Sequence, residues 1–137
     1  MCLTLNDTEI RIAEEDIICY KVFVKQGNTL ISPYQKMCYK CGTMYVSETP
    51  MIVKHGKGLL WQNITCVEEG FHSFSYKKEA ECLKQVLSNL STNAGSNYVV
   101  VKCLIPVGTR YAVGVFYDFG WFSNSLCSER IIAVEEV

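Results

Sequence analysis

Most of the chain shows the pattern of apolar and polar residues that is typical of β-strands. Short runs rich in β-branched and aromatic residues are separated by turn residues such as Gly, Asn and Pro. The glycine-containing turns after residues 24 and 54 and the Pro-Val-Gly turn after residue 105 favour hairpins. We expect strands within residues 17–24, 29–32, 37–46, 51–54, 59–67, 98–105, 110–117 and 131–134.

One segment has the helical period instead. Its apolar residues recur at the spacing of one helix face, while its lysines and glutamates fall off that face. The sequence predicts a helix over about 76–91, with Ser75 as its N-cap and a stop near Asn93 and Gly95. The apolar face consists of Ala80, Leu83, Val86, Leu87 and Leu90.

The order of these elements is strands, a single helix, and further strands. Because the helix is solitary and hairpin turns dominate, a mainly antiparallel sheet is favoured over a doubly wound parallel one. We therefore predict a single α+β domain over residues 1–137, with a sheet of about six to eight strands packed on one central helix.

Composition agrees with an ordinary globular protein. The chain has 137 residues, of which 49% are hydrophobic and 20% charged, and this balance supports a packed core. The longest apolar stretch, 98–107, is broken by Lys102 and Pro106 and is shorter than the roughly 20 residues of a membrane helix. With five acidic residues early in the chain and no signal-peptide pattern, we expect a cytoplasmic protein with no membrane partner.

The chain contains eight cysteines, and in a reducing compartment we expect them to be free thiols. Cys38 and Cys41 form a CxxC pair, which is half of a zinc knuckle. No second close pair follows, and His55 and His72 lie at unrelated spacings. We predict no metal site, with Cys38 and Cys41 as the only weak candidates.

The segment at residues 69–75, just before the helix, combines Phe71, His72 and Ser73. Backbone N–H groups and hydroxyls at a helix N-terminus can hold an anion, and a histidine beside serines also suits acid-base chemistry. No carboxylate is placed by spacing to orient His72, so a hydrogen-bonded structural histidine is the simpler interpretation.

Two aromatic patterns suggest contact surfaces. Five large rings fall within residues 116–122, more than one turn can bury, and we expect Phe119, Trp121 and Phe122 to contribute to a contact surface. Tyr-Lys neighbours such as Tyr20 and Lys21 could stack on and pair with single-stranded nucleic acid. A half-buried strand with a solvated outer face gives the same pattern, so nucleic acid is the less favoured partner.

Four blocks resemble a diffuse family of small uncharacterised proteins of phages, prophages and gut bacteria. They are Tyr20-Lys21, EGFHSF at 69–74, CLIPVGTRYAVG at 103–114 and SERI at 128–131. More remotely, the Gly-Phe-aromatic-Ser block before an alanine-containing helix is similar to ADP-ribosyltransferase-like folds, in which that block borders the NAD pocket. This similarity implies a pocket formed by Tyr20, Phe71, His72, Ser73 and Glu129.

Our first hypothesis is a small non-enzymatic binding or inhibitor protein of a phage or mobile element, which uses no cofactor. It would counter a host defence by binding a host protein or sequestering a nucleotide, and if it is phage-encoded it would act in the cytoplasm of the host cell. One alternative is an ADP-ribosyltransferase-like NAD-binding domain with His72, Ser73 and Glu129 as catalytic residues, and another is a zinc-knuckle nucleic-acid binder. The predicted binding residues are Tyr20, Lys21, Phe71, His72, Ser73, Phe119, Trp121 and Phe122.

Overall fold

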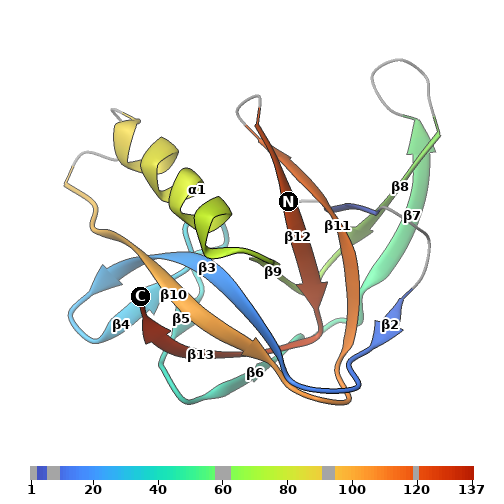
Figure 1. Ribbon diagram of the computed structural model, residues 1–137, viewed down its shortest axis with the longest axis horizontal. Coiled ribbons are helices and arrows are strands. Elements are labelled where there is room, and N and C mark those ends of the chain that lie inside the picture. The colour runs from blue at the N-terminus through green and yellow to red at the C-terminus, as the bar shows by residue number, and fades with distance from the viewer. Residues whose placement is uncertain (1–2, 6–9, 58–62, 91–94, 119–120) are drawn as a thin grey trace.

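In a computed structural model, the chain folds into an extensive antiparallel sheet accompanied by the helix α1 (Figure 1). The structure describes residues 3–5, 10–57, 63–90, 95–118 and 121–137. The elements are β1 (Leu3–Leu5), β2 (Arg11–Ile12), β3 (Ile17–Gln26), β4 (Thr29–Ile31), β5 (Cys38–Tyr39), β6 (Met44–Val46), β7 (Ile52–Lys57), β8 (Asn63–Glu68), β9 (Phe71–Phe74), α1 (Lys77–Asn89), β10 (Tyr98–Ile105), β11 (Arg110–Asp118), β12 (Trp121–Ser128) and β13 (Arg130–Glu136).

All described strands join one sheet, and every pairing among them is antiparallel. The main path runs β6-β13-β10-β3-β9-β12-β11-β1-β8-β7, while β2, β4 and β5 attach beside it. The predicted α+β class is confirmed, but the predicted six to eight strands are too few, because the main path alone has ten. Strands of two or three residues, such as β5 and β6, are too short to leave an alternating pattern in the sequence.

The predicted helix is confirmed as α1, but its predicted N-cap is wrong. Tyr76 occupies the N-cap position, and no side chain caps the helix there. The backbone N–H of Ser75 instead donates to the Asn124 carbonyl at 3.1 Å. The Glu79 carboxylate, in the first turn, accepts the Asn124 backbone N–H at 3.1 Å. Contacts with β12 therefore fix where the helix begins.

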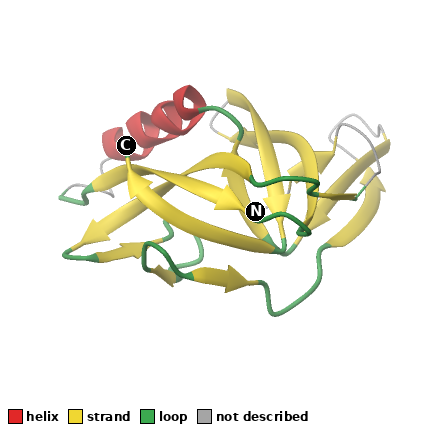
Figure 2. Ribbon diagram, turned by 60° about the horizontal axis from the view of Figure 1, so that its bottom comes forward, coloured by secondary structure: helices red, strands yellow, loops and turns green. Residues whose placement is uncertain are grey.

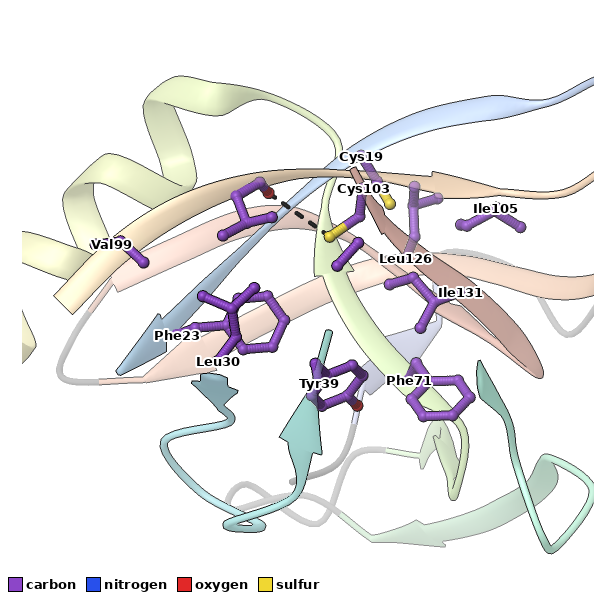
Figure 3. Close-up of a cluster of buried hydrophobic side chains, with 12 residues drawn as sticks. Cys19, Phe23, Leu30, Tyr39, Phe71, Val99, Cys103, Ile105, Leu126 and Ile131 are labelled. Atoms are coloured by element: carbon purple, nitrogen blue, oxygen red, sulfur yellow. Dashed lines mark hydrogen bonds between the residues drawn. The ribbon is translucent and has the colours of Figure 1, made fainter. Parts of the chain in front are cut away.

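The central strands are buried on both faces because neighbouring residues on a strand point to opposite sides. Figure 2 shows α1 over one face and the short strands of residues 29–46 below the other. Val22 packs beneath α1 with Leu83 and Leu87. Its neighbour Phe23 packs on the opposite side with the Tyr39 ring, 5.0 Å away between centroids, in the cluster shown in Figure 3. The sheet thus separates two hydrophobic cores.

Six cysteines are free thiols in the structure, in agreement with the sequence prediction: Cys19, Cys38, Cys41, Cys82, Cys103 and Cys127. Cys19, Cys103 and Cys127 are buried, whereas the other three are exposed. Burial raises the pKa of Cys19 to about 11, although the Ser73 hydroxyl and the Lys21 charge oppose this rise. Desolvation also raises the pKa of Cys103. These core thiols behave as small apolar side chains.

No helix among the described residues has the length and apolar character that crossing a bilayer requires.

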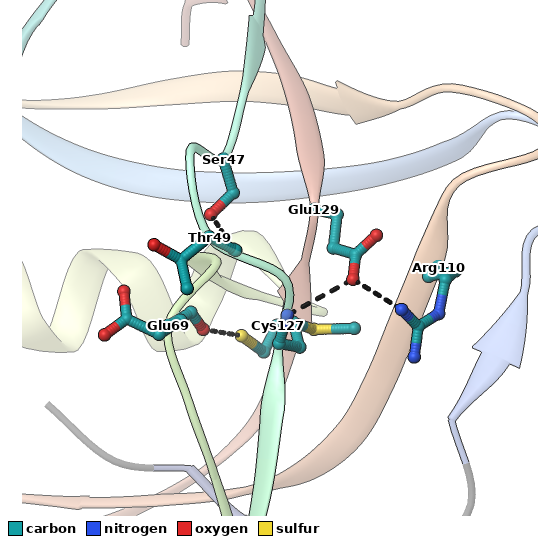
Figure 4. Close-up of polar contacts among 7 residues, drawn as sticks. Ser47, Thr49, Glu69, Arg110, Cys127 and Glu129 are labelled. Carbon is teal, nitrogen blue, oxygen red and sulfur yellow. Dashed lines mark hydrogen bonds and ion pairs between the residues drawn. The ribbon is translucent and has the colours of Figure 1, made fainter.

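The turn from β8 to β9 passes very close to β12. Glu69 and Gly70 both have left-handed backbone angles, with φ of 64° and 83°. A Cβ atom on Gly70 would lie 2.9 Å from both the Cys127 Sγ and the Ser128 carbonyl oxygen. The Cys127 thiol donates to the Glu69 carbonyl at 2.9 Å, as Figure 4 shows. Glycine at position 70 therefore sets the position where β9 starts.

Replacing Gly70 by alanine should destabilise the protein more than the same change at Gly95. Both glycines have a left-handed φ, but a Cβ on Gly95 would meet no atom within 4 Å. The conformational cost is about 1 to 2 kcal/mol in each case, and the clash at Gly70 should add roughly 1 to 3 kcal/mol. Urea unfolding measures both losses, and equal losses would contradict the close approach to β12.

Candidate functional site

The candidate site lies where two central strands separate. β3 pairs with β10 from Ile17 to Val24, but it meets β9 at the single register pair Tyr20 with Phe74. Beyond that pair, the Lys21 Nζ donates a hydrogen bond to the His72 carbonyl oxygen at 2.7 Å. A side chain therefore replaces the regular backbone hydrogen bonds at this point, and an opening remains between the strands.

A small pocket occupies this opening, with a cavity volume of about 30 Å³. A second hollow of about 30 Å³ shares Lys21, His72, Pro33 and Tyr34 with it. β3, the loop after β4, and β9 therefore meet here. The first pocket is lined by Lys21, Val22, Pro33, Tyr34, His72, Ser73, Phe74, Leu83 and Ser125, and the second hollow adds Ser32, Gln35 and Phe71.

His72 is held as a neutral imidazole in this environment. Burial lowers its pKa to about 3, and the charge of Lys21 contributes in the same direction. Its Nε2 lies 3.9 Å from the Sγ of Cys127, its register partner on β12. Its Nδ1 is buried without a hydrogen-bond partner among the described residues. The ring is thus uncharged near pH 7 and has one unused nitrogen.

The Lys21 amine is buried, although the residue as a whole is half-buried, and it has no carboxylate partner among the described residues. Desolvation lowers its pKa, and the neighbouring thiols of Cys103, Cys19 and Cys127 only partly offset that shift. Its Nζ lies 5.9 Å from the centroid of the Phe23 ring. Among the described residues, no carboxylate lies within ion-pair distance of it. An ammonium has three N–H donors, so Lys21 can bind an acceptor in addition to the His72 carbonyl.

Four predicted binding residues lie together in this region. Lys21, His72 and Ser73 line the first pocket, and Phe71 lines the second hollow. The Ser73 hydroxyl is buried; it lowers the pKa of the neighbouring Cys19 thiol, and it has no other hydrogen-bond partner in the described part of the chain. Tyr20 packs against the core beneath α1, next to the pocket. Phe119 and the side chains of Trp121 and Phe122 lie outside what the structure describes.

Sequence reasoning missed the loop after β4. Ser32, Pro33, Tyr34 and Gln35 contribute to the walls of the two hollows. In the sequence they form an ordinary polar break after a strand. The only local signal is a tyrosine beside a proline in that break, and Tyr34 is 43% exposed.

Glu129 does not belong to this pocket. Its Oε1 accepts the Arg110 Nη1 at 3.0 Å and the Met51 backbone N–H at 3.2 Å (Figure 4). This carboxylate is therefore engaged in joining β11 and β12 to the start of β7, and it is not among the residues that line the pocket. The structure brings His72 and Ser73 together without Glu129.

Cys38 and Cys41 are both exposed. The described residues contain no group of three or more His, Cys, Asp or Glu side chains that could hold a metal ion. The CxxC pair accordingly lacks, within that part of the chain, the further ligands of a closed zinc site.

The chain matches no protein-family model, no curated protein and no solved structure. Function must therefore be inferred from the chemistry of the pocket.

The buried neutral state of His72 predicts a loss of stability in acid. Its pKa is about 3 in the folded protein against an ordinary value of 6.5, so the unfolded chain binds the proton first. The free energy of unfolding should be unaffected above about pH 6.5 and fall below it, by at most about 1.4 kcal/mol per pH unit down to about pH 3.

Unfolding measured from pH 7 to pH 4 for the wild type and for His72→Gln isolates this contribution, because other titrating groups cancel in the difference. His55→Gln is the matched control, since His55 is exposed. A wild-type pH dependence identical to that of His72→Gln would contradict the buried neutral histidine.

Proposed function

We propose that the protein is a non-enzymatic binding protein that holds a carboxylate of a partner protein at Lys21. The observation that carries this proposal is the buried Lys21 amine, which has a backbone carbonyl as its partner and no carboxylate nearby in the described chain. A buried charge costs several kcal/mol unless it is paired. A ligand that brings the counter-charge would remove that cost, which is typical of a binding site.

The size of the pocket favours the end of a side chain over a whole nucleotide. A water molecule needs about 10 to 15 Å³ of such volume, so about 30 Å³ accommodates about two waters or one carboxylate group. A whole nucleotide is far larger than this volume, so no more than one small group of it could enter. The sequence leaves a host protein and a nucleotide as alternative partners, and the volume supports the protein.

The remaining pocket groups suit the recognition of a carboxylate. The Ser73 hydroxyl can donate one hydrogen bond, and neutral His72 can donate another from Nδ1 in the appropriate tautomer. Apolar walls from residues such as Leu83 lower the local dielectric, which strengthens the attraction between the ammonium and the carboxylate.

The pocket has no carboxylate to orient His72 as a base toward Ser73 among its lining residues. This absence favours binding over catalysis. The phage origin and the counter-defence role suggested by the sequence resemblance stay predictions; a small binding protein is compatible with both.

Acetate and acetamide offer a direct test, because they have nearly the same shape and differ in charge. Acetate should raise the thermal unfolding midpoint of the wild type, and acetamide should not. Lys21→Met should abolish the acetate effect, whereas Lys25→Met, on the same strand and ion-paired to Glu136 near the surface, should retain it.

The acetate effect should weaken as the pH rises through the lowered pKa of Lys21, since a neutral amine does not attract an anion. An acetate effect of equal size in Lys21→Met and the wild type would contradict the proposal. Adenosine monophosphate and NAD form a second arm. If either nucleotide binds more tightly than acetate and this binding is lost in Lys21→Met, the ligand of the pocket is a nucleotide and not a carboxylate of a partner protein.

A further inference from the structure

A row of apolar side chains crosses four strands on the outer part of the sheet. Met44 on β6 is the register partner of Ile132 on β13. Ile132 is in turn the register partner of Leu104 on β10, and Leu104 is the register partner of Ile18 on β3. Register partners lie side by side on one face of a sheet. Ile18 is 50% exposed and Met44 is 48% exposed, while the two residues between them are partly exposed. This group is called the apolar row below.

The apolar row belongs to the face that α1 covers only in part. Tyr20 and Val22 lie two and four residues after Ile18 on β3, so their side chains point to the same side of the sheet as Ile18. Both contribute to the core beneath α1. On β10, Val100 lies four residues before Leu104, points to the same side and also belongs to this core. The helix therefore covers one end of these strands, and the apolar row is exposed at the other end. An apolar surface of this kind on a folded protein is typical of an interaction site.

Charged residues of opposite sign lie on β13 at the two sides of the apolar row. On β13, Arg130 lies two residues before Ile132, and Glu135 lies on the far side of it, opposite Lys102 on β10. Arg130 and Glu135 are both exposed, and neither forms an ion pair with another described residue. The two ends of this stretch of β13 therefore carry opposite charges, and Lys102 on β10 adds a cation beside Glu135.

This arrangement is complementary to itself. If a second copy packs face to face about a two-fold axis that runs along the row, apolar residues meet apolar residues. The same rotation exchanges the two borders, so that Arg130 of each copy faces Glu135 of the other. We infer that the apolar row is the interface through which two copies of this chain associate. The inference is independent of the function proposed for the Lys21 pocket.

Charge reversal tests this interface. Sedimentation equilibrium over a range of concentrations should show that the wild type dimerises reversibly. Arg130→Glu and Glu135→Arg should each weaken the dimer at least about tenfold in its dissociation constant, because like charges then face each other. The double variant R130E/E135R should recover most of the wild-type association, because the two charges are exchanged.

The apolar part of the interface needs a separate control. Ile18→Asp should abolish dimer formation, whereas Ile12→Asp should not, although Ile12 on β2 is the more exposed residue at 65%. Cooperative thermal unfolding of each variant confirms that it remains folded. A wild type that is monomeric at every concentration would overturn the inference. So would a double variant no better than the single ones, or equal effects of Ile12→Asp and Ile18→Asp.

Discussion

The hydrogen bond from the Lys21 ammonium to the His72 carbonyl determines how the two central strands meet. β3 and β9 share one register pair, and past it this 2.7 Å contact replaces the regular backbone bonds. It gives the His72 carbonyl a hydrogen-bond donor at the place where the two strands separate and the pocket opens. It also fixes the amine in a buried position, where it has no carboxylate partner among the described residues. The same contact therefore creates the cavity and supplies its charge.

Contacts outside the pocket hold β3, β9 and α1 in the positions that form it. The close turn at Gly70 determines where β9 begins, and so where the carbonyl that receives the Lys21 bond lies. Glu79 and Asn124 connect the start of α1 to β12, which places Leu83 over the opening. The two hydrophobic cores hold the sheet rigid on either side of the gap. Stability and binding are linked here, because the fold bears the cost of a buried amine that a ligand can relieve.

The sequence predicted the features that depend on local pattern. The long strands and α1 have clear periods, and the segment from Phe71 to Ser73 is conspicuous before a helix, so these were predictable. Strands of two or three residues have no measurable period, and the loop at Ser32 to Gln35 joins the pocket only through contacts with residues far along the chain. Glu129 lies outside the pocket, and its contact with Met51, 78 residues away along the chain, leaves no signal in the local sequence.

The protonation of the Lys21 side chain tests the central claim most directly. A pH titration of its side-chain nitrogen, followed by nuclear magnetic resonance with Lys21→Met for assignment, measures its pKa in the folded protein. A buried amine without a counter-charge should titrate below the ordinary value of 10.5, and acetate should move the titration back toward that value. A pKa at or above 10.5 without any added anion would show that the amine is solvated or already paired, and would contradict the account.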